Sequence, residues 1–158
     1  IEKNLLAAIS FQESQWDPRA QSNMGVRGMM MVTLETAALV GVEKRLNPEQ
    51  NIKGGAKYLS QMLKRLPDYV RDNDKVWFSL ASYNVGYYHL RDAMALTVLQ
   101  NKDPGSWTHL RQVLPLLSKR KYYKNLRYGY ARGLEPVIYV SRIRNYHELL
   151  LSQLQAQR

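Results

Sequence analysis

Helical periodicity runs through almost the whole chain, and it constrains the fold more than any other feature of the sequence. The clearest case follows Asn47-Pro48, where apolar residues recur at helical spacing: Ile52, Ala56, Leu59, Leu63 and Leu66. Such spacing is typical of the buried face of an α-helix, and proline suits its first position. The only candidate for extended structure is a short segment over residues 26–33. The pattern therefore predicts a mainly α fold.

Further helices are predicted on both sides of this one, separated by short breaks. They are an opening helix ended by Asp17-Pro18, a helix from Leu34 to Val40 between Thr33 and Gly41, a helix capped by Asp74 that runs to Tyr83-Asn84, and helices over 87–100, 107–117 and 135–154. Pro115 should interrupt the helix that contains it. Gly54 and Gly55 lie inside a helix, where we expect close approach of a neighbouring backbone.

Composition limits the kind of protein that this chain can form. Its 158 residues are enough for one domain with a sizeable core, which we expect to be excised from a longer parent chain. There is no cysteine, so disulfides and thiolate metal sites are excluded. The three histidines are scattered without metal-ligand spacing, and we expect neither a metal nor a cofactor. No apolar run approaches the roughly 18 residues that a membrane-spanning helix needs.

The net charge of +10 favours a polyanionic partner, such as nucleic acid, an anionic membrane or an acidic polysaccharide. Much of the excess lies in residues 119–128, where basic side chains alternate with tyrosines. Such a segment can follow phosphates and stack on bases. It can equally be a solvated basic face that tyrosines anchor to the core. We favour the second interpretation, because no nucleic-acid-binding motif accompanies the segment.

Glu13 occupies a position where a leucine would be expected. In the opening helix, Leu5, Ile9, Glu13 and Trp16 share an arc of roughly 80° at 100° per residue. A carboxyl on this apolar stripe is partly desolvated, which favours its neutral form and raises its pKa. A neutral carboxyl is what a general acid acting on glycosidic bonds requires. The alternative is a glutamate at a helix end that reaches water or pairs with a nearby arginine or lysine.

Three further segments are candidates for lining a site. Two contain polar or aromatic residues, Tyr83-Asn84 and Tyr139, and the third is the glycine- and methionine-containing segment 25–31. Sites collect at helix ends and loops. The chain has 11 tyrosines and only 2 phenylalanines, a bias that suits a polar, sugar-binding groove better than a dry core. Each cluster alone is weak evidence, because a tyrosine on a helix stripe is more often part of the core.

Taken in order, these clusters resemble the motifs of a known family. They are Glu13-Ser14 followed by Pro18; Gly28-Met29-Met30-Met31; Asn51-Ile52 with Gly55-Ala56 and Tyr58-Leu59; Ala81-Ser82-Tyr83-Asn84-Val85-Gly86; and Glu135-Pro136-Val137-Ile138-Tyr139-Val140. The chain resembles the catalytic module of the family 1 lytic transglycosylases over roughly residues 5–146. Two departures are Met31, where the family has Gln, and Pro136, where it has Thr. The run 128–133 and the methionines at 29–31 resemble one subgroup of the family.

The resemblance implies a single lysozyme-like helical domain, of the goose-type lysozyme and soluble lytic transglycosylase kind, with a substrate groove. It implies non-hydrolytic cleavage of the β-1,4 bond between N-acetylmuramic acid and N-acetylglucosamine. Glu13 would be the single general acid and then the base. The substrate-binding residues would be Ser14, Met30, Tyr83, Asn84 and Tyr139. Hydrolytic glycosidases need a second carboxylate, for which Asp17 and Glu135 are the nearest candidates.

The resemblance also implies partners and a location. We expect peptidoglycan glycan strands as substrate, no nucleic acid, and a monomer in which only the parent chain contacts the membrane. The parent would be periplasmic and attached to the outer membrane. Two other functions stay open: a goose-type-lysozyme-like hydrolase on the same fold, and a non-catalytic basic helical module that binds glycan or nucleic acid.

Overall fold

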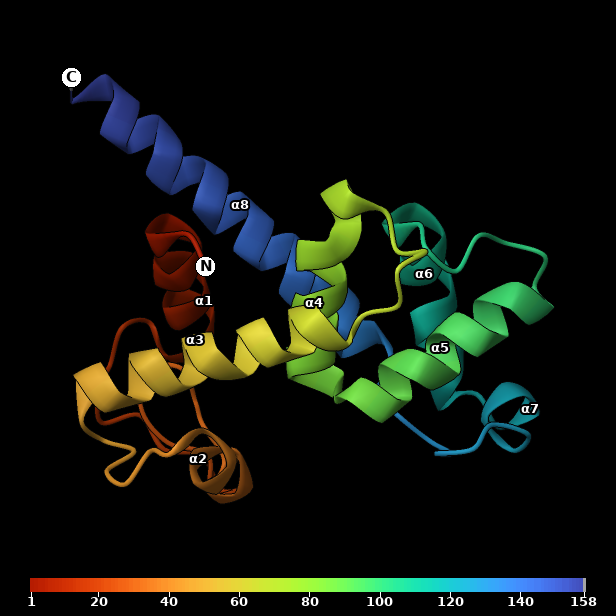
Figure 1. Cartoon of the computed structure of the whole chain (residues 1–158), viewed down its shortest axis with the longest axis horizontal. Helices are drawn as coiled ribbons and strands as arrows, with labels where there is room; N and C mark the ends of the chain where they lie inside the picture. Colours follow the sequence, from red (N-terminus) through yellow and green to blue (C-terminus); the bar gives the residue numbers. More distant parts are fainter. Residues whose placement is uncertain (158) are drawn as a thin grey trace. The chain divides into compact units, whose positions relative to one another are not determined.

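The computed structural model describes residues 1–157 and confirms the mainly α fold. Helices account for 66% of the structure, and residues 1–157 contain no β-strand. The α-helices are α1 (Lys3–Ser14), α2 (Leu34–Val40), α3 (Pro48–Arg65), α4 (Lys75–Val85), α5 (Tyr87–Leu99), α6 (Trp107–Val113), α7 (Arg120–Tyr123) and α8 (Leu134–Ala156) (Figure 1). Short 3-10 helices cover Asp72–Asp74 and Leu114–Ser118. In this described part of the chain, no helix combines the length and apolar character needed to cross a membrane.

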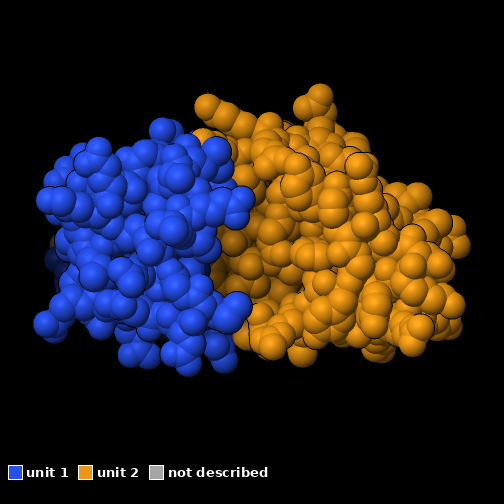
Figure 2. All heavy atoms as spheres, turned by 90° about the horizontal axis from the view of Figure 1, so that it is seen from below, with its two compact units in different colours: residues 1–60, 141–158 blue, residues 61–140 orange. Residues whose placement is uncertain are grey.

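The chain divides into two compact units, coloured separately in Figure 2. Unit 1 comprises residues 1–60 together with the segment from residue 141 onward, and unit 2 comprises residues 61–140. The boundaries fall within α3 and α8. Each unit has its own set of buried apolar side chains.

In unit 1, α1 ends earlier than predicted. Glu2 caps the helix, since its carboxylate accepts hydrogen bonds from the backbone N–H groups of Asn4 and Leu5 at 2.8 and 3.0 Å. The last helical residue is Ser14, because Gln15 and Trp16 adopt left-handed backbone conformations with φ of 52° and 63°. Placing Trp16 on the apolar stripe of α1 was therefore wrong. Its side chain is 46% exposed, and its indole N–H donates to the carbonyl of Ala7 at 2.9 Å.

The first part of the chain also packs against its end within unit 1. The rings of Phe11 and Tyr146 meet edge to face with centroids 4.8 Å apart, and His147 Nε2 lies 2.8 Å from the Glu2 carboxylate. Figure 1 shows the later turns of α8, in blue, beside α1, in red. The two contacts hold α1 at both of its ends.

The predicted bounds of α2 are confirmed, with Thr33 as its cap and Gly41 at its end. The start of α3 at Pro48 is also confirmed. The expectation for the two glycines of α3 was partly wrong. Added Cβ atoms would lie 2.3 Å from the Val42 side chain at Gly54 and 2.8 Å from that of Met30 at Gly55. The close neighbours are thus side chains rather than backbone.

Residues 26–33 form no strand. Two isolated antiparallel bridges join Gln21 to Arg27 and Arg27 to Val32. The segment therefore has the limited extended character that the sequence suggested.

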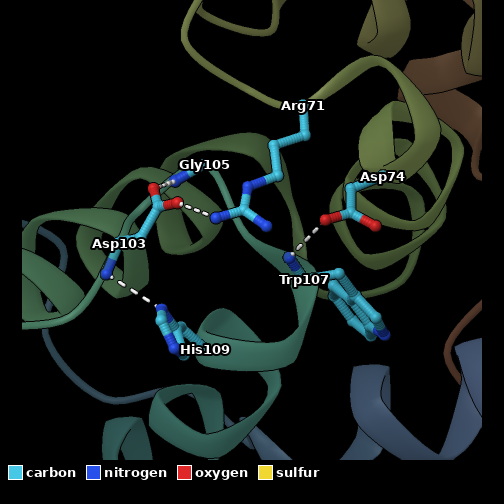
Figure 3. Close-up of polar contacts among 6 residues, drawn as sticks. All are labelled: Arg71, Asp74, Asp103, Gly105, Trp107 and His109. Atoms are coloured by element: carbon cyan, nitrogen blue, oxygen red, sulfur yellow. Dashed lines mark hydrogen bonds and ion pairs between the residues drawn. The ribbon is translucent and has the colours of Figure 1, made fainter.

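In unit 2, the helix after Asp74 starts where predicted, but Asp74 does not cap it. Its carboxylate accepts a hydrogen bond from the backbone N–H of Trp107, the first residue of α6, at 2.9 Å. Figure 3 shows the neighbouring network, in which Asp103 pairs with Arg71 at 2.7 Å and accepts from the N–H of Gly105 at 2.8 Å. The N–H of Gly105 and then the Arg71 guanidinium hold the pKa of Asp103 below its ordinary value. This network joins the segments that precede α4 and α6.

The rest of unit 2 follows the predicted breaks closely. Gly86, with φ of 93°, separates α4 from α5, and a turn over residues 101–105 follows α5. α6 ends at Val113 and is followed by a 3-10 helix whose second residue is Pro115, so the proline interrupts the α-helix as expected from its missing N–H. The short helix α7 in the basic segment was not predicted. Its four residues carry no apolar stripe that a periodicity search could detect.

Candidate active site

Glu13 lies on the last turn of α1, and its side chain is half-buried. Leu5 and Ile9, one and two turns earlier, are buried in the core of unit 1. Three residues of the predicted stripe therefore lie as expected, and the carboxylate is the last of them. The chain then leaves the helix through the left-handed residues Gln15 and Trp16. Residues in this sparsely populated region often lie next to functional groups.

Ser14 joins the end of α1 to the segment that contains the three methionines. Its hydroxyl oxygen lies 2.8 Å from the carbonyl oxygen of Met29 and 3.1 Å from that of Ser10. The one hydroxyl proton can serve either carbonyl, and the lone pairs of the oxygen stay available to accept a hydrogen bond. The residue after Glu13 thus connects the helix end to the Gly28–Met31 turn.

Met30 is fully buried, with 0% of its surface exposed. Its backbone N–H donates to the side-chain oxygen of Asn51 at 2.7 Å, and its sulfur lies 3.1 Å from the hydroxyl of Ser10. The side chain therefore supports the turn from inside. Met29 and Met31 are half-buried and present more surface, and Met31 has a positive φ of 47°.

Asn51 organises this turn, a role that its place in a motif did not predict. It is fully buried, and its amide nitrogen donates to the carbonyls of Arg27 and Arg45 at 2.9 and 2.8 Å, while its oxygen accepts from Met30. Gly28 is needed beside it, because a Cβ there would lie 2.4 Å from the Asn51 amide nitrogen. A polar residue in the first turn of an otherwise amphipathic helix was the signal that could have identified it.

Tyr83, Asn84 and Tyr139 belong to unit 2. Tyr83 is half-buried and Asn84 is exposed, both on the last turn of α4 before Gly86. Tyr139, on the first part of α8, is 5% exposed and therefore a buried residue. The structure thus brings Glu13, Ser14 and Met30 together in unit 1, and Tyr83 with Asn84 at one helix end in unit 2.

The two candidates for a second carboxylate are both exposed, and each interacts with a residue close to it in the sequence. Asp17 accepts from the backbone N–H of Arg19 at 2.9 Å in the turn after α1. Glu135 lies 3.5 Å from the guanidinium of Arg132, one turn away in sequence. Neither is held by a buried partner.

An apolar pocket of about 160 Å³ lies near the end of α1. It is lined by Phe11, Trp16, Tyr146, Leu149, Leu150 and Gln153. No carboxylate lines it, so it offers no proton donor for glycoside cleavage. Among residues 1–157, no group of three or more histidine, aspartate or glutamate side chains is placed to hold a metal ion.

Residues 1–104 match the sequence model of the family described as transglycosylase SLT domain. This match includes Glu13, Ser14, Met30, Tyr83 and Asn84 but not Tyr139.

Relatives named membrane-bound lytic murein transglycosylase F bear out the resemblance to one subgroup. The Shewanella loihica protein is 56% identical over 146 residues, which cover 92% of this chain and 31% of the relative. The Photobacterium profundum protein is 55% identical over 152 residues, which cover 96% of this chain and 30% of the relative. The chain thus spans about a third of the length of these relatives.

The fold resembles that of the 70 kDa soluble lytic transglycosylase from Escherichia coli. The TM-score is 0.61 at 23% sequence identity, over 96% of this chain and 22% of that one. The predicted lysozyme-like helical fold is therefore confirmed.

Proposed function

This chain belongs to the transglycosylase SLT domain family, and on that premise we propose that it is a peptidoglycan lytic transglycosylase. The reaction is cleavage of the β-1,4 bond between N-acetylmuramic acid and N-acetylglucosamine without water. Its product is a 1,6-anhydromuramoyl end. Relatives of high identity carry the name lytic murein transglycosylase, which supports this activity.

The observation that carries the proposal is the position of Glu13. The carboxyl is half-buried on the last turn of α1, directly before a serine that binds the Gly28–Met31 turn. A catalytic acid needs a fixed position and a partly desolvated environment, and this helix end supplies both. Asp17 and Glu135 are exposed, which favours a scheme with one carboxylate.

In the proposed mechanism, Glu13 first protonates the oxygen of the leaving sugar. The 2-acetamido group of the substrate, or an oxocarbenium-like species, carries the developing positive charge. Glu13 then removes the proton from the C6 hydroxyl, whose oxygen bonds to C1 and closes the anhydro ring. This nucleophile is part of the substrate, so its effective concentration is high and no water is consumed.

The other predicted site residues have proposed roles in binding. Ser14, Tyr83, Asn84 and Tyr139 orient the sugar and polarise its acetamido group, and Ser14 also holds the Gly28–Met31 turn through Met29. Met30 acts from the buried side of that turn. Met31, where the family has Gln, supplies no amide to the substrate.

The proposal includes the surroundings of the enzyme. The substrate is the glycan strand of peptidoglycan, whose lactyl and peptide carboxylates suit a chain of net charge +10. Residues 1–158 act as a monomeric catalytic domain that needs no cofactor. A parent chain attached to the outer membrane, in the periplasm, accounts for membrane association like that in the names of the relatives.

Mass spectrometry of the muropeptides released from purified sacculi tests the proposal. A lytic transglycosylase releases 1,6-anhydromuramoyl products, which contain one water fewer than hydrolysis products. Reducing ends would instead identify a goose-type-lysozyme-like hydrolase. If no glycan is cleaved and Glu13→Gln changes nothing, the chain is a non-catalytic binding module.

A further inference from the structure

Unit 2 contains a pocket lined mainly by tyrosines and arginines, which come from segments far apart in the sequence. Its volume is about 270 Å³. It is lined by Tyr87, Tyr88, Arg91, Asp92, Arg127 and Tyr128. We name it the Tyr–Arg pocket. The basic segment, which the sequence favoured as a solvated face anchored by tyrosines, thus contributes its last two residues, Arg127 and Tyr128, to a site shared with α5.

The tyrosines present ring surface to solvent. Tyr88 and Tyr128 stack with ring centroids 4.8 Å apart and an interplanar angle of 30°, and Tyr87 meets Tyr88 edge to face at 5.6 Å. Tyr88 is 53% exposed and Tyr128 is 37% exposed. Aromatic residues with one apolar face and a polar edge suit ligands that have both characters, as sugars do.

Three guanidinium groups surround these rings. Arg65 lies 3.8 Å above the ring of Tyr87, and Arg127 lies 5.5 Å from that of Tyr128. Arg91 donates to the hydroxyl of Tyr87 at 3.2 Å. Within residues 1–157, the ion pairs of this structure involve none of the three. Each guanidinium has five N–H donors, so most of their capacity is left for a ligand.

One carboxylate also lines the pocket. Asp92 is buried and accepts a hydrogen bond from the backbone N–H of Tyr128 at 2.8 Å. This bond fixes the 127–128 segment against α5. The two arginines that line the pocket outnumber this one carboxylate, and Arg65 beside Tyr87 adds a further positive charge, so the surroundings favour an anionic ligand.

We propose that the Tyr–Arg pocket binds the anionic sugar–peptide portion of peptidoglycan. The exposed rings contact the apolar face of an N-acetylated sugar, and the guanidinium groups bind the lactyl-linked peptide stem through its carboxylates. Arginine suits this role because its planar fork matches a carboxylate with two parallel hydrogen bonds. The inference rests on the proposed function and adds a substrate preference to it: strands that carry peptide stems bind better than strands stripped of them.

The first experiment measures binding without cleavage. Calorimetry with N-acetylmuramyl tetrapeptide, which lacks the scissile bond, is compared for the wild type, Arg91→Gln and Arg127→Gln. The control is Arg111→Gln, an exposed arginine of α6 in the same unit that removes the same charge. Each pocket variant should bind roughly fivefold more weakly at low salt, as expected for loss of one exposed ion pair. The control should bind like the wild type.

Arg91→Lys keeps the charge and should recover part of the affinity, and melting temperatures show whether each variant is folded. If Arg111→Gln lost as much affinity as the pocket variants, the effect would come from net charge alone, and the proposal would be overturned. Unchanged binding in folded pocket variants would overturn it as well. The proposal would also be overturned if a single-stranded oligonucleotide competed for the pocket with higher affinity than the muramyl peptide.

The second experiment separates this inference from the proposed function. Turnover is measured on glycan strands with peptide stems and on strands from which an amidase has removed them. Pocket variants should raise KM on the first substrate with kcat unchanged, and raise it less on the second, in which only the freed lactyl carboxylate remains for the arginines to bind. Cleavage of both substrates with no effect of the pocket variants would contradict the pocket alone, whereas absence of cleavage by the wild type would contradict the proposed function.

Discussion

The hydroxyl of Ser14 lies 2.8 Å from the carbonyl oxygen of Met29. This contact joins the last residue of α1 to a turn fifteen positions later in the sequence. The turn is held from its other side by the buried amide of Asn51, which accepts from Met30. Ser14 therefore fixes the helix end that carries the candidate acid to a turn that Asn51 in turn anchors to α3.

Glu13→Gln should abolish glycan cleavage while the fold and glycan binding persist. Glutamine keeps the shape of the side chain but cannot donate a carboxyl proton and take one back. Loss of general acid catalysis typically reduces the rate 10²–10⁴-fold, and we expect the upper end because one group serves both steps. Muropeptide release from sacculi and the melting temperature are the measurements. A variant that retains a tenth of wild-type turnover would exclude Glu13 as the acid.

Ser14→Ala should reduce turnover by more than its effect on stability explains. The change removes the hydrogen bond to Met29 and should destabilise the fold by about 1 kcal/mol. It also loosens the Gly28–Met31 turn next to Glu13. Thr97→Val is the control, because the buried Thr97 hydroxyl donates to Ala93 within α5 alone. If both variants lose the same turnover at equal melting temperature, the Ser14 contact has no specific role in the site.

Gly28→Ala should destabilise the protein far more than Gly25→Ala. Both glycines have positive φ, 84° and 77°. At Gly28 a Cβ would lie 2.3 Å from the carbonyl oxygen of Arg45, whereas at Gly25 nothing lies within 4 Å. We expect about 1–2 kcal/mol for the backbone conformation alone at Gly25 and about 2–5 kcal/mol at Gly28, where the clash adds to it. Urea unfolding of both variants checks this, and similar losses would show that the turn can shift to accept the methyl group.

Tyr139→Phe should reduce turnover more than it reduces stability. Tyr139 is buried on α8, so its ring contributes to the core whatever the hydroxyl does. The proposed function adds a role for the hydroxyl at the substrate acetamido group. A purely structural hydroxyl would cost about 1–3 kcal/mol if a buried partner is stranded, with little change in catalysis. Unchanged turnover on sacculi would show that Tyr139 has only a structural role in the core.

Acidification should remove the contribution of the Glu2 cap. The backbone N–H of Asn4 holds the pKa of Glu2 below its ordinary value of 4.5, with a further contribution from His147. Because the pKa is lowered in the folded state, the stabilisation is complete above pH 4.5 and is lost as the pH falls through the lowered value. Glu2→Ala should therefore lower the melting temperature at pH 7, and the difference from the wild type should shrink by pH 3.

The matched control for Glu2 is Glu148→Ala, which removes an exposed carboxylate of α8. Its effect on the melting temperature should be small at both pH values. A Glu2→Ala difference that stays constant from pH 7 to pH 3 would contradict a cap that depends on the charge of the carboxylate.

Most helix positions were predictable from the sequence, because their signals are local. The stripe of α3, the Thr33 cap of α2 and the break at Pro115 each depend on residues within a few positions of one another. Glu13 was identifiable for the same reason, since a carboxylate on an apolar stripe is visible from spacing alone. The resemblance to the family depended on short motifs of the same local kind.

Only the tertiary structure decided which distant residues meet. It ended α1 at Ser14 and turned Trp16 away from the stripe. In the folded chain, the carboxylate of Asp74 accepts a hydrogen bond from the backbone N–H of Trp107, 33 positions later, instead of capping its own helix. The tertiary structure also placed Arg127 and Tyr128 beside α5 in the Tyr–Arg pocket. Local spacing determines which face of a helix is apolar, but hydrogen-bond partners depend on distances that exist only after the helices have packed.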